Sequence, residues 1–367
     1  MIFMRALFSI GAVGSLLFLL SCVSYEKTFD KEALEKNEEF DKIIKIEEFV
    51  EPEKKEIPVV KSKKVKPIPR VDSKKESPPS RPQIAQYPSP PPAKVPSQEE
   101  EALARELEAA RKKQLKEPRQ PKFEDSEGFN GRRPVVDPFA VGEEVVLSLS
   151  YFGVEAGKFT LKVEPMVQIN GKKAYHYKYT VKSSPLFKWV YQVNDVAETF
   201  VDYQTLLPYS YEIHVNESKQ VRETRTYFNH KTKKATMWDK KQKKGEAVEE
   251  KKIGWDLEEY SQNVFSVASY LRTFTLKVGK KLQVNVGHEG KNILMTAEVL
   301  RKEKVFTKAG AFDAFVVKPS FDVDGKFKPT GENFLWLTAD DRKFIVRLES
   351  KIKIGSIVGE AEKIIVK

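Results

Sequence analysis

Cysteine and histidine are scarce in this sequence. Its 367 residues include one cysteine, Cys22, and four histidines, at positions 176, 214, 230 and 288. A single cysteine excludes a disulfide within the chain, and the histidines do not stand at the spacing of metal ligands. The sequence also lacks a Gly-x-Ser-x-Gly elbow, a Ser-x-x-Lys motif and a P-loop. We therefore expect no catalytic residues, no metal site, no cofactor and no enzymatic activity.

Long hydrophobic runs are equally scarce, and one of them, Ala6 to Ser21, stands close to the amino terminus. Its 16 residues are too few for a membrane-spanning helix, which needs about 20, but they are typical of a secretory signal. The run ends in Leu19-Leu20-Ser21-Cys22, which resembles the lipobox of bacterial lipoproteins. The resemblance implies a signal peptide at residues 1–21, cleavage before Cys22 and acylation of that residue. An ordinary signal peptide or an uncleaved anchor with an incidental cysteine is the alternative.

A lipid on Cys22 would make a membrane the first partner of this protein, because acyl chains hold a protein there almost permanently. In enterobacteria an Asp directly after the lipidated cysteine retains a lipoprotein in the inner membrane. Here Val23 and Ser24 follow Cys22. By this analogy we expect a cell-envelope protein on the outer membrane, facing the periplasm.

The charge of the chain is mildly basic and evenly spread. The formal net charge is +11, and residues 137–367 contain 38 basic and 30 acidic residues without a basic cluster. A nucleic-acid-binding protein would concentrate its lysines and arginines, so we expect no nucleic-acid partner. A basic excess suits both an anionic envelope and a solvated surface.

Residues 22–136 have the composition of a disordered tether rich in Pro, Lys and Glu. Sixteen of the 21 prolines lie in residues 1–138, and such a segment buries too little apolar surface to fold. Helices are possible at 31–49 and 99–116, the second as a solvated single helix or as a coiled-coil or partner helix. A coil of this length spans roughly 60 Å, which would hold a domain clear of a membrane or let its lysines contact peptidoglycan.

Residues 137–367 have the period-two alternation of β-strands. Asn170-Gly171 is a strong hairpin signal, and residues 240–252 read as a charged loop or exposed hairpin around Gly245. One segment, 256–274, has helical periodicity with Asp256 as its N-cap. We expect a mainly β domain of about 12–14 antiparallel strands with one mid-domain helix, arranged as a partly open β-barrel or a sandwich.

Aromatic side chains alternate along two of the predicted strands. Tyr175, Tyr177 and Tyr179 share one face, and Trp189 and Tyr191 follow shortly after. They are candidates for lining a concave ligand-binding face. The alternative is ordinary core, because alternating aromatics are what a sheet buries.

Several short motifs occur along this domain in a fixed order. They are Phe139-x-Val141-Gly142-Glu143, Tyr151-Phe152-Gly153-Val154-x-Ala156-Gly157, Leu206-x-Pro208, the segment Ser261–Arg272, Gly310-x-Phe312, Trp336-Leu337-Thr338-x-Asp340-Asp341-Arg342 and Lys353-Ile354-Gly355. In their order and spacing these motifs resemble a bacterial family, that of domain of unknown function 3108. The resemblance runs from about Phe139 to Val366 and leaves the tether out. It implies an exported, β-rich domain and imports no activity.

Three functions fit these observations. The first is a non-enzymatic lipoprotein whose β domain binds an envelope lipid, glycan or protein, which a large apolar cavity would favour. The second is a structural or scaffolding lipoprotein that contacts peptidoglycan or another envelope protein, which a filled core with an exposed apolar edge would favour. The third, a hydrolase of envelope polymers, requires convergent carboxylates, and Asp340-Asp341-Arg342 is more simply read as a charged turn.

Overall fold

A computed structural model describes residue 34 and residues 36–50, 133–134, 136–189, 191–323, 326–327, 332–351 and 355–366. Cys22, the lipobox and the predicted helix at 99–116 lie outside these residues. Within the described ranges, no helix has the length and apolar character needed to cross a membrane.

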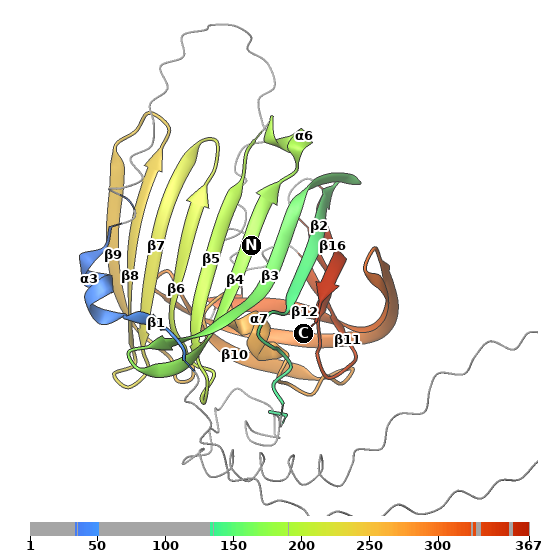
Figure 1. Cartoon of the computed structure of the whole chain (residues 1–367). Helices are drawn as coiled ribbons and strands as arrows, with labels where there is room; N and C mark the ends of the chain where they lie inside the picture. The colour runs from blue at the N-terminus through green and yellow to red at the C-terminus, as the bar shows by residue number, and fades with distance from the viewer. Residues whose placement is uncertain are drawn as a thin grey trace, which may run out of the picture. The chain divides into compact units, whose positions relative to one another are not determined.

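The domain consists almost entirely of antiparallel strands (Figure 1). The strands are β1 (Ile46–Glu48), β2 (Glu144–Tyr151), β3 (Val154–Ile169), β4 (Lys172–Ser183), β5 (Asn194–Asp202), β6 (Pro208–Asn216), β7 (Gln220–Asn229), β8 (Lys234–Lys243), β9 (Val248–Asp256), β10 (Lys281–His288), β11 (Lys291–Thr307), β12 (Gly310–Val323), β13 (Lys326–Phe327), β14 (Asn333–Thr338), β15 (Ile345–Lys351) and β16 (Ser356–Ile365). The described helices are short: α3 (Glu38–Ile43), α6 (Pro185–Lys188) and α7 (Ser266–Leu271).

All of these strands belong to one sheet. Its main path has the order β10-β11-β12-β14-β15-β16-β2-β3-β4-β5-β6-β7-β8-β9, with β1 paired to β3 and β13 to β12 beside it. The two ends of the path, β9 and β10, do not pair with each other. The predicted mainly β fold is confirmed as a partly open barrel, and the sandwich alternative is wrong. The main path has fourteen strands, and β1 and β13 are short additions to the expected 12–14.

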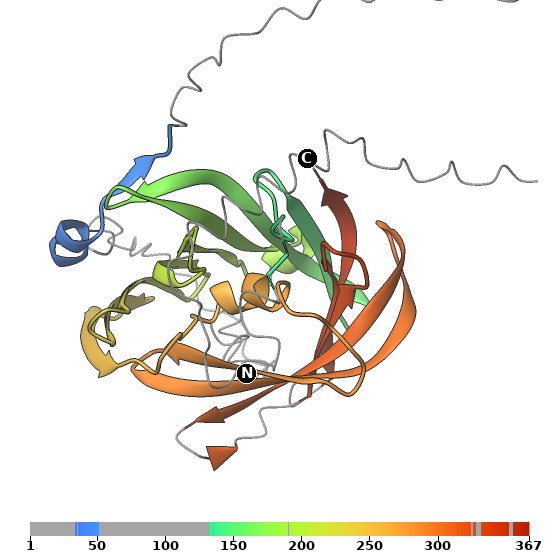
Figure 2. The ribbon, with the colours of Figure 1, turned by 90° about the horizontal axis from the view of Figure 1, so that it is seen from below.

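The sheet curls around α7, which lies on its inner side (Figure 2). All six residues of this helix are buried, and side chains from both halves of the sheet close over them. The segment before α7 covers part of the open edge, because Gln262 bonds to β10 through Asn285 and Gly287. The largest fully buried side chains of the core include Leu147, Tyr211, Phe228, Phe265, Phe274 and Leu282.

The mid-domain helix is much shorter than the predicted segment 256–274. Asp256 ends β9 and does not cap a helix, and α7 begins only at Ser266. Tyr260 adopts a φ of 56°, which no right-handed helix allows. Leu257 and Val264, two members of the apolar pattern, are nevertheless buried. The apolar pattern therefore predicted correctly that these residues are buried inside the barrel. The helical conformation that it predicted for residues 256–265 is wrong.

Both hairpins expected from turn residues are present. Asn170 and Gly171 join β3 to β4 with φ angles of 50° and 77°, the left-handed values of a two-residue hairpin turn. β8 and β9 form the exposed hairpin around Gly245, whose φ is 83°.

Part of the predicted tether is folded onto the domain. Residues 36–50, which we call the docked segment, contain α3 and β1, and β1 pairs antiparallel with the end of β3 from Ile46↔Ile169 to Glu48↔Val167. The tether prediction is wrong for these residues. Of the predicted helix at 31–49, residues 36–49 contain only the six residues of α3, and β1 follows where the helix was expected to continue. Asn37 caps this helix by accepting a bond from the Phe40 amide at 3.1 Å.

An apolar patch on the outer face of the sheet receives the docked segment. The Phe40 ring, 2% exposed, meets Trp238 edge-on at a centroid distance of 6.0 Å. The Trp238 indole donates to Glu39 at 2.9 Å, and Lys252 pairs with the same carboxylate. Ile44 of the docked segment also packs in this cluster. On the sheet, the patch comprises Trp238, Ile169, Ala174 and Phe200. A phenylalanine buried in this way is worth about 2–3 kcal/mol of hydrophobic free energy.

Candidate functional site

Three charged side chains from distant parts of the chain meet at the inner side of the sheet. Glu143 stands just before β2, Arg272 follows α7, and Arg342 lies in the turn between β14 and β15. Arg272 Nη1 donates to Glu143 Oε1 at 2.6 Å, and Arg342 Nη2 donates to Glu143 Oε2 at 2.8 Å. One carboxylate therefore ties the helix and two separate turns together.

The Glu143–Arg272 pair is buried and its hydrogen-bonding groups are used. The Glu143 and Arg272 side chains are 4% and 8% exposed. Arg272 also donates to the Pro138 carbonyl at 2.6 Å and to the Arg342 carbonyl at 2.8 Å. All three nitrogen atoms of the Arg272 guanidinium therefore donate to residues outside the helix. The arrangement ties α7 to the residues before β2 and to the β14–β15 turn.

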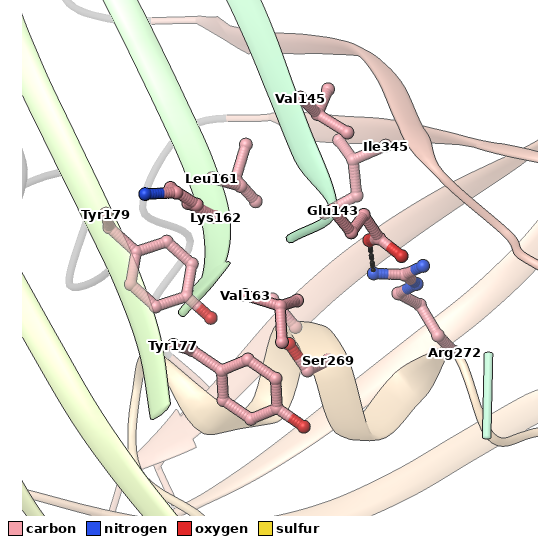
Figure 3. Close-up of a pocket in the computed structure, with 11 residues that line it drawn as sticks. Glu143, Val145, Leu161, Lys162, Val163, Tyr177, Tyr179, Ser269, Arg272 and Ile345 are labelled. Atoms are coloured by element: carbon pink, nitrogen blue, oxygen red, sulfur yellow. Dashed lines mark hydrogen bonds and ion pairs between the residues drawn. The ribbon is translucent and has the colours of Figure 1, made fainter. Parts of the chain in front are cut away.

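A small pocket adjoins this ion pair (Figure 3). Its volume is about 20 Å³ and its lining includes Tyr177, Tyr179, Ser269 and Arg272. The Tyr177 hydroxyl is buried without a hydrogen-bond partner among the described residues. A volume of this size accommodates about one water molecule. It is far too small for an acyl chain or a sugar.

The candidate ligand-facing aromatics do not form one surface. Tyr175, Tyr177 and Tyr179 are each 3–4% exposed and point into the core. The Tyr179 hydroxyl donates to the Phe265 carbonyl at 2.9 Å, and burial raises its pKa to about 12. For these three residues the structure favours the core alternative.

Trp189 and Tyr191 lie elsewhere. Trp189, directly after α6, is 93% exposed. The Tyr191 hydroxyl donates to Glu217 at 2.7 Å. The five aromatics are therefore divided between the interior and the end of the sheet that carries α6.

The acidic turn expected between strands is present. Asp340 Oδ1 accepts bonds from the Thr338 hydroxyl at 2.7 Å and from the backbone amides of Arg342 and Lys343 at 3.1 and 2.9 Å. These contacts make Asp340 a turn cap. Its Oδ1 atom is engaged by the turn itself, which supports the reading of Asp340-Asp341-Arg342 as a charged turn.

The histidines are placed singly, each with a local partner. His176 pairs with Glu198 at 2.9 Å, and this bond lowers the pKa of Glu198 to about 2. Burial lowers the pKa of His288 to about 4, so that the ring is neutral beside Tyr211. Within the described ranges no group of three His, Cys, Asp or Glu side chains could hold a metal ion.

A larger, open depression lies on the outer face beside the docked segment. It has a volume of about 430 Å³, and its walls come from Glu48 and Phe49, the β3 residues 164–167, His176 and Lys178. This size is within the range of small-ligand sites. The docked segment supplies one wall, so the depression exists only while that segment is bound.

Sequence reasoning missed the roles of Glu143 and Arg272. Both were present in the motifs that carry the family resemblance, together with Arg342. The only signal in the sequence was that each of the three residues lies in a different motif of the family resemblance. That signal does not indicate that the three side chains meet.

These features define an open antiparallel β-barrel domain whose inner helix is locked to the sheet by a buried ion pair. A family model described as "Protein of unknown function (DUF3108)" matches residues 147–362. The chain belongs to this family, as the motifs predicted. A comparison with curated proteins found no match.

Among solved structures, the chain is similar at 11% identity to three bacterial proteins. One is a beta-barrel-like protein of domain of unknown function DUF1849 from Brucella abortus, with a TM-score of 0.43 over 62% of this chain and 98% of that one. Another is a Bacteroides fragilis protein with a YmcC-like fold, described provisionally as exported, with a TM-score of 0.29 over 62% and 98%. The third, from Parabacteroides distasonis, is described provisionally as a lipoprotein and has a TM-score of 0.28 over 62% and 96%.

Proposed function

We propose that this protein is a non-enzymatic lipoprotein of the bacterial cell envelope, anchored through Cys22 on the outer membrane and facing the periplasm. The observation that carries the proposal is Leu19-Leu20-Ser21-Cys22 at the end of a 16-residue apolar run. A diacylglycerol on the Cys22 thiol and an acylated amino terminus would hold the chain on the bilayer.

We further propose that the β domain binds its partner with its outer surfaces. The pocket at the centre of the inner side has room for about one water molecule, which argues against an enclosed lipid. A protein or glycan held on the outside fits the filled interior better. Of the functions considered, scaffolding by contact with another envelope component is therefore favoured over binding of a lipid inside the barrel. The depression of about 430 Å³ beside the docked segment has a size that suits a glycan.

The docked segment changes how far the domain reaches from the membrane. Lys36 contacts the domain through its carbonyl, which accepts a bond from Lys240 at 2.9 Å. It lies fourteen positions after Cys22, and a fully extended chain over that distance spans at most about 50 Å. While the segment is docked, these residues set the reach, in place of the roughly 115-residue tether expected from the sequence.

Fractionation of cells that express Cys22→Ala tests the anchor. We expect the wild-type chain in the membrane fraction with palmitate incorporated, and the variant without label and released from the membrane. Ser24→Ala, which leaves the thiol and the run before it intact, is the matched control and should behave as wild type. Unchanged fractionation and labelling of Cys22→Ala would refute the anchor.

A further inference from the structure

Exposed hydrophobic side chains gather at one end of the sheet. Phe152, in the β2–β3 turn, is 69% exposed, and Leu186 and Trp189, in and after α6, are 67% and 93% exposed. Phe306, at the tip of the β11–β12 hairpin, is 72% exposed. We call these four residues the apolar tips. Phe152, Trp189 and Phe306 are the three aromatic residues among the exposed large hydrophobics of the described ranges.

Direct contacts hold the three turns together. Ser184, which caps α6, bonds through its amide to the Ala156 carbonyl at 2.8 Å and through its hydroxyl to the Glu155 carbonyl at 3.0 Å. Lys308 pairs with the Glu155 carboxylate at 3.7 Å, and the Ala309 amide bonds to the Ala361 carbonyl at 3.0 Å. The apolar tips therefore belong to turns that contact one another.

Cationic side chains accompany the apolar tips. Lys182 and Lys188 are exposed and lie at the end of β4 and in α6. Lys308, in the β11–β12 turn, is also exposed, but its charge is paired with Glu155. Tryptophan, phenylalanine and leucine side chains among lysines are the composition of surfaces that insert shallowly into an anionic bilayer. Protruding turns suit a deformable lipid surface, whereas a protein partner would be met by a flat or grooved patch.

The docked segment brings the chain to the domain on the side of these turns. Lys240, which holds the Lys36 carbonyl, is nearer to the β8–β9 turn around Gly245 than to the β7–β8 turn at residues 230–233. The β8–β9 turn and α6 lie at the same end of the sheet (Figure 1). The docked segment therefore begins, at Lys36, on the half of the sheet that carries the apolar tips.

We propose that the apolar tips form a membrane-contact surface, which inserts Trp189, Leu186, Phe152 and Phe306 into the interface of an anionic phospholipid bilayer. This rests on the proposed function, since the anchor on Cys22 supplies the bilayer. The contact gives the domain a fixed orientation, with the apolar tips toward the lipid and the opposite end of the sheet toward the periplasm.

Tryptophan quenching in vesicles tests this surface. The full chain is placed in vesicles of phosphatidylethanolamine and phosphatidylglycerol, and quenching by brominated acyl chains is compared with quenching by aqueous iodide. Trp238 and Trp336 are buried and Trp255 is half-buried, so the lipid-dependent signal should come from Trp189 and disappear in Trp189→Phe. Equal bromolipid quenching in wild type and Trp189→Phe would overturn the proposal.

Two variants separate the apolar and charged contributions. Leu186→Ser/Phe306→Ser should lower the ratio of lipid-inserted to water-exposed Trp189 about tenfold, because each lost side chain removes a large apolar area. Val278→Ser, which changes a half-exposed aliphatic residue in another loop, is the matched control and should have no effect. Lys188→Gln should lower the ratio about fivefold on anionic vesicles and leave it unchanged on phosphatidylcholine.

The outcomes distinguish this surface from the anchor. Intact mass of the same preparation shows whether Cys22 is acylated. An unmodified Cys22 with Trp189-dependent quenching refutes the anchor and supports the membrane surface. An acylated chain with Trp189 fully open to iodide supports the anchor and refutes the membrane surface, which would then be a contact for another macromolecule.

Discussion

Arg272 and Glu143 are 129 positions apart in the sequence, and their charged atoms lie 2.6 Å apart inside the barrel. Both side chains are almost fully buried. Because Glu143 precedes β2 and Arg272 follows α7, this pair fixes the inner helix to the middle of the sheet.

Removing one member of this pair should destabilise the domain strongly. Arg272→Met leaves a buried carboxylate with Arg342 as its remaining partner, and we expect the free energy of unfolding in urea to fall by about 3–5 kcal/mol. Arg301→Met, at an ion pair with Glu303 whose arginine is 50% exposed, is the control and should cost about 0–1 kcal/mol. Similar losses of unfolding free energy in the two variants would contradict a stabilising role for the Glu143–Arg272 ion pair.

Asp195 should make the domain less stable as the pH rises. Burial raises the pKa of Asp195 to about 7 in the folded state, whereas an unfolded aspartate ionises near pH 4. Between these values the unfolded chain binds fewer protons than the folded one, so the free energy of unfolding falls with increasing pH. Above pH 7 the domain has lost all of the unfolding free energy that this carboxyl can remove, and below pH 4 it has lost none.

Asp195→Asn should abolish this slope. The Asn oxygen can still accept the bond from the Asn216 amide, which is 2.9 Å long in the wild type. Relative to wild type, the variant should gain on the order of 2–4 kcal/mol between pH 4 and pH 8. Urea titrations across this range provide the measurement. Parallel pH profiles for the two proteins would show that burial does not perturb this carboxyl.

Gly157 should not tolerate a side chain. A Cβ atom at this position would lie 2.3 Å from the Lys182 carbonyl oxygen of the adjoining strand. We expect Gly157→Ala to lower the melting temperature clearly, with a loss of about 2–4 kcal/mol, because backbone atoms must move. Gly254→Ala is the matched strand control, since its nearest neighbour would be 3.8 Å away. An unaltered melting temperature for Gly157→Ala would count against this packing.

Docking of residues 36–50 should depend on Phe40. Phe40→Ala removes the ring that fills the outer patch, and amide hydrogen exchange at β1 should accelerate at least about tenfold. Exchange in β4 and β5, whose bonds do not involve the segment, should stay the same. Ile43→Ala, at a side chain 37% exposed, should leave β1 protected. Fast exchange of β1 in the wild type would contradict docking altogether.

The sequence allowed the β architecture to be predicted because its signals are local. Alternation along Val145, Leu147 and Leu149 marks a strand whatever it pairs with. Asn170-Gly171 defines its hairpin because two successive left-handed residues permit little else. These local signals could not distinguish a barrel from a sandwich, because that choice depends on which strands pair over long distances in the sequence.

The errors arose where distant contacts override local preference. Residues 257–265 carry a helical apolar pattern, yet Gln262 bonds to the edge of β10 and the helix starts later. The docked segment was assigned to the charged tether because its apolar residues are interspersed with charged ones and precede the proline-rich run. Its partner patch, around Phe200 and Trp238, is assembled from four strands and cannot be read from any one of them. The ion pair of Glu143 likewise joins residues that no spacing rule connects.

Pairing of β1 with β3 has a topological consequence. Both ends of the segment between residues 50 and 133 are attached to the same domain, so docking closes a loop of about 80 residues. The entropy of closing a loop changes by about 0.6 kcal/mol for each doubling of its length. Halving this proline-rich segment would therefore strengthen docking by roughly threefold, and lengthening it would loosen the domain from the chain that leads to Cys22. By this argument the docking equilibrium would depend on the length of this segment and would require no specific contact by its residues.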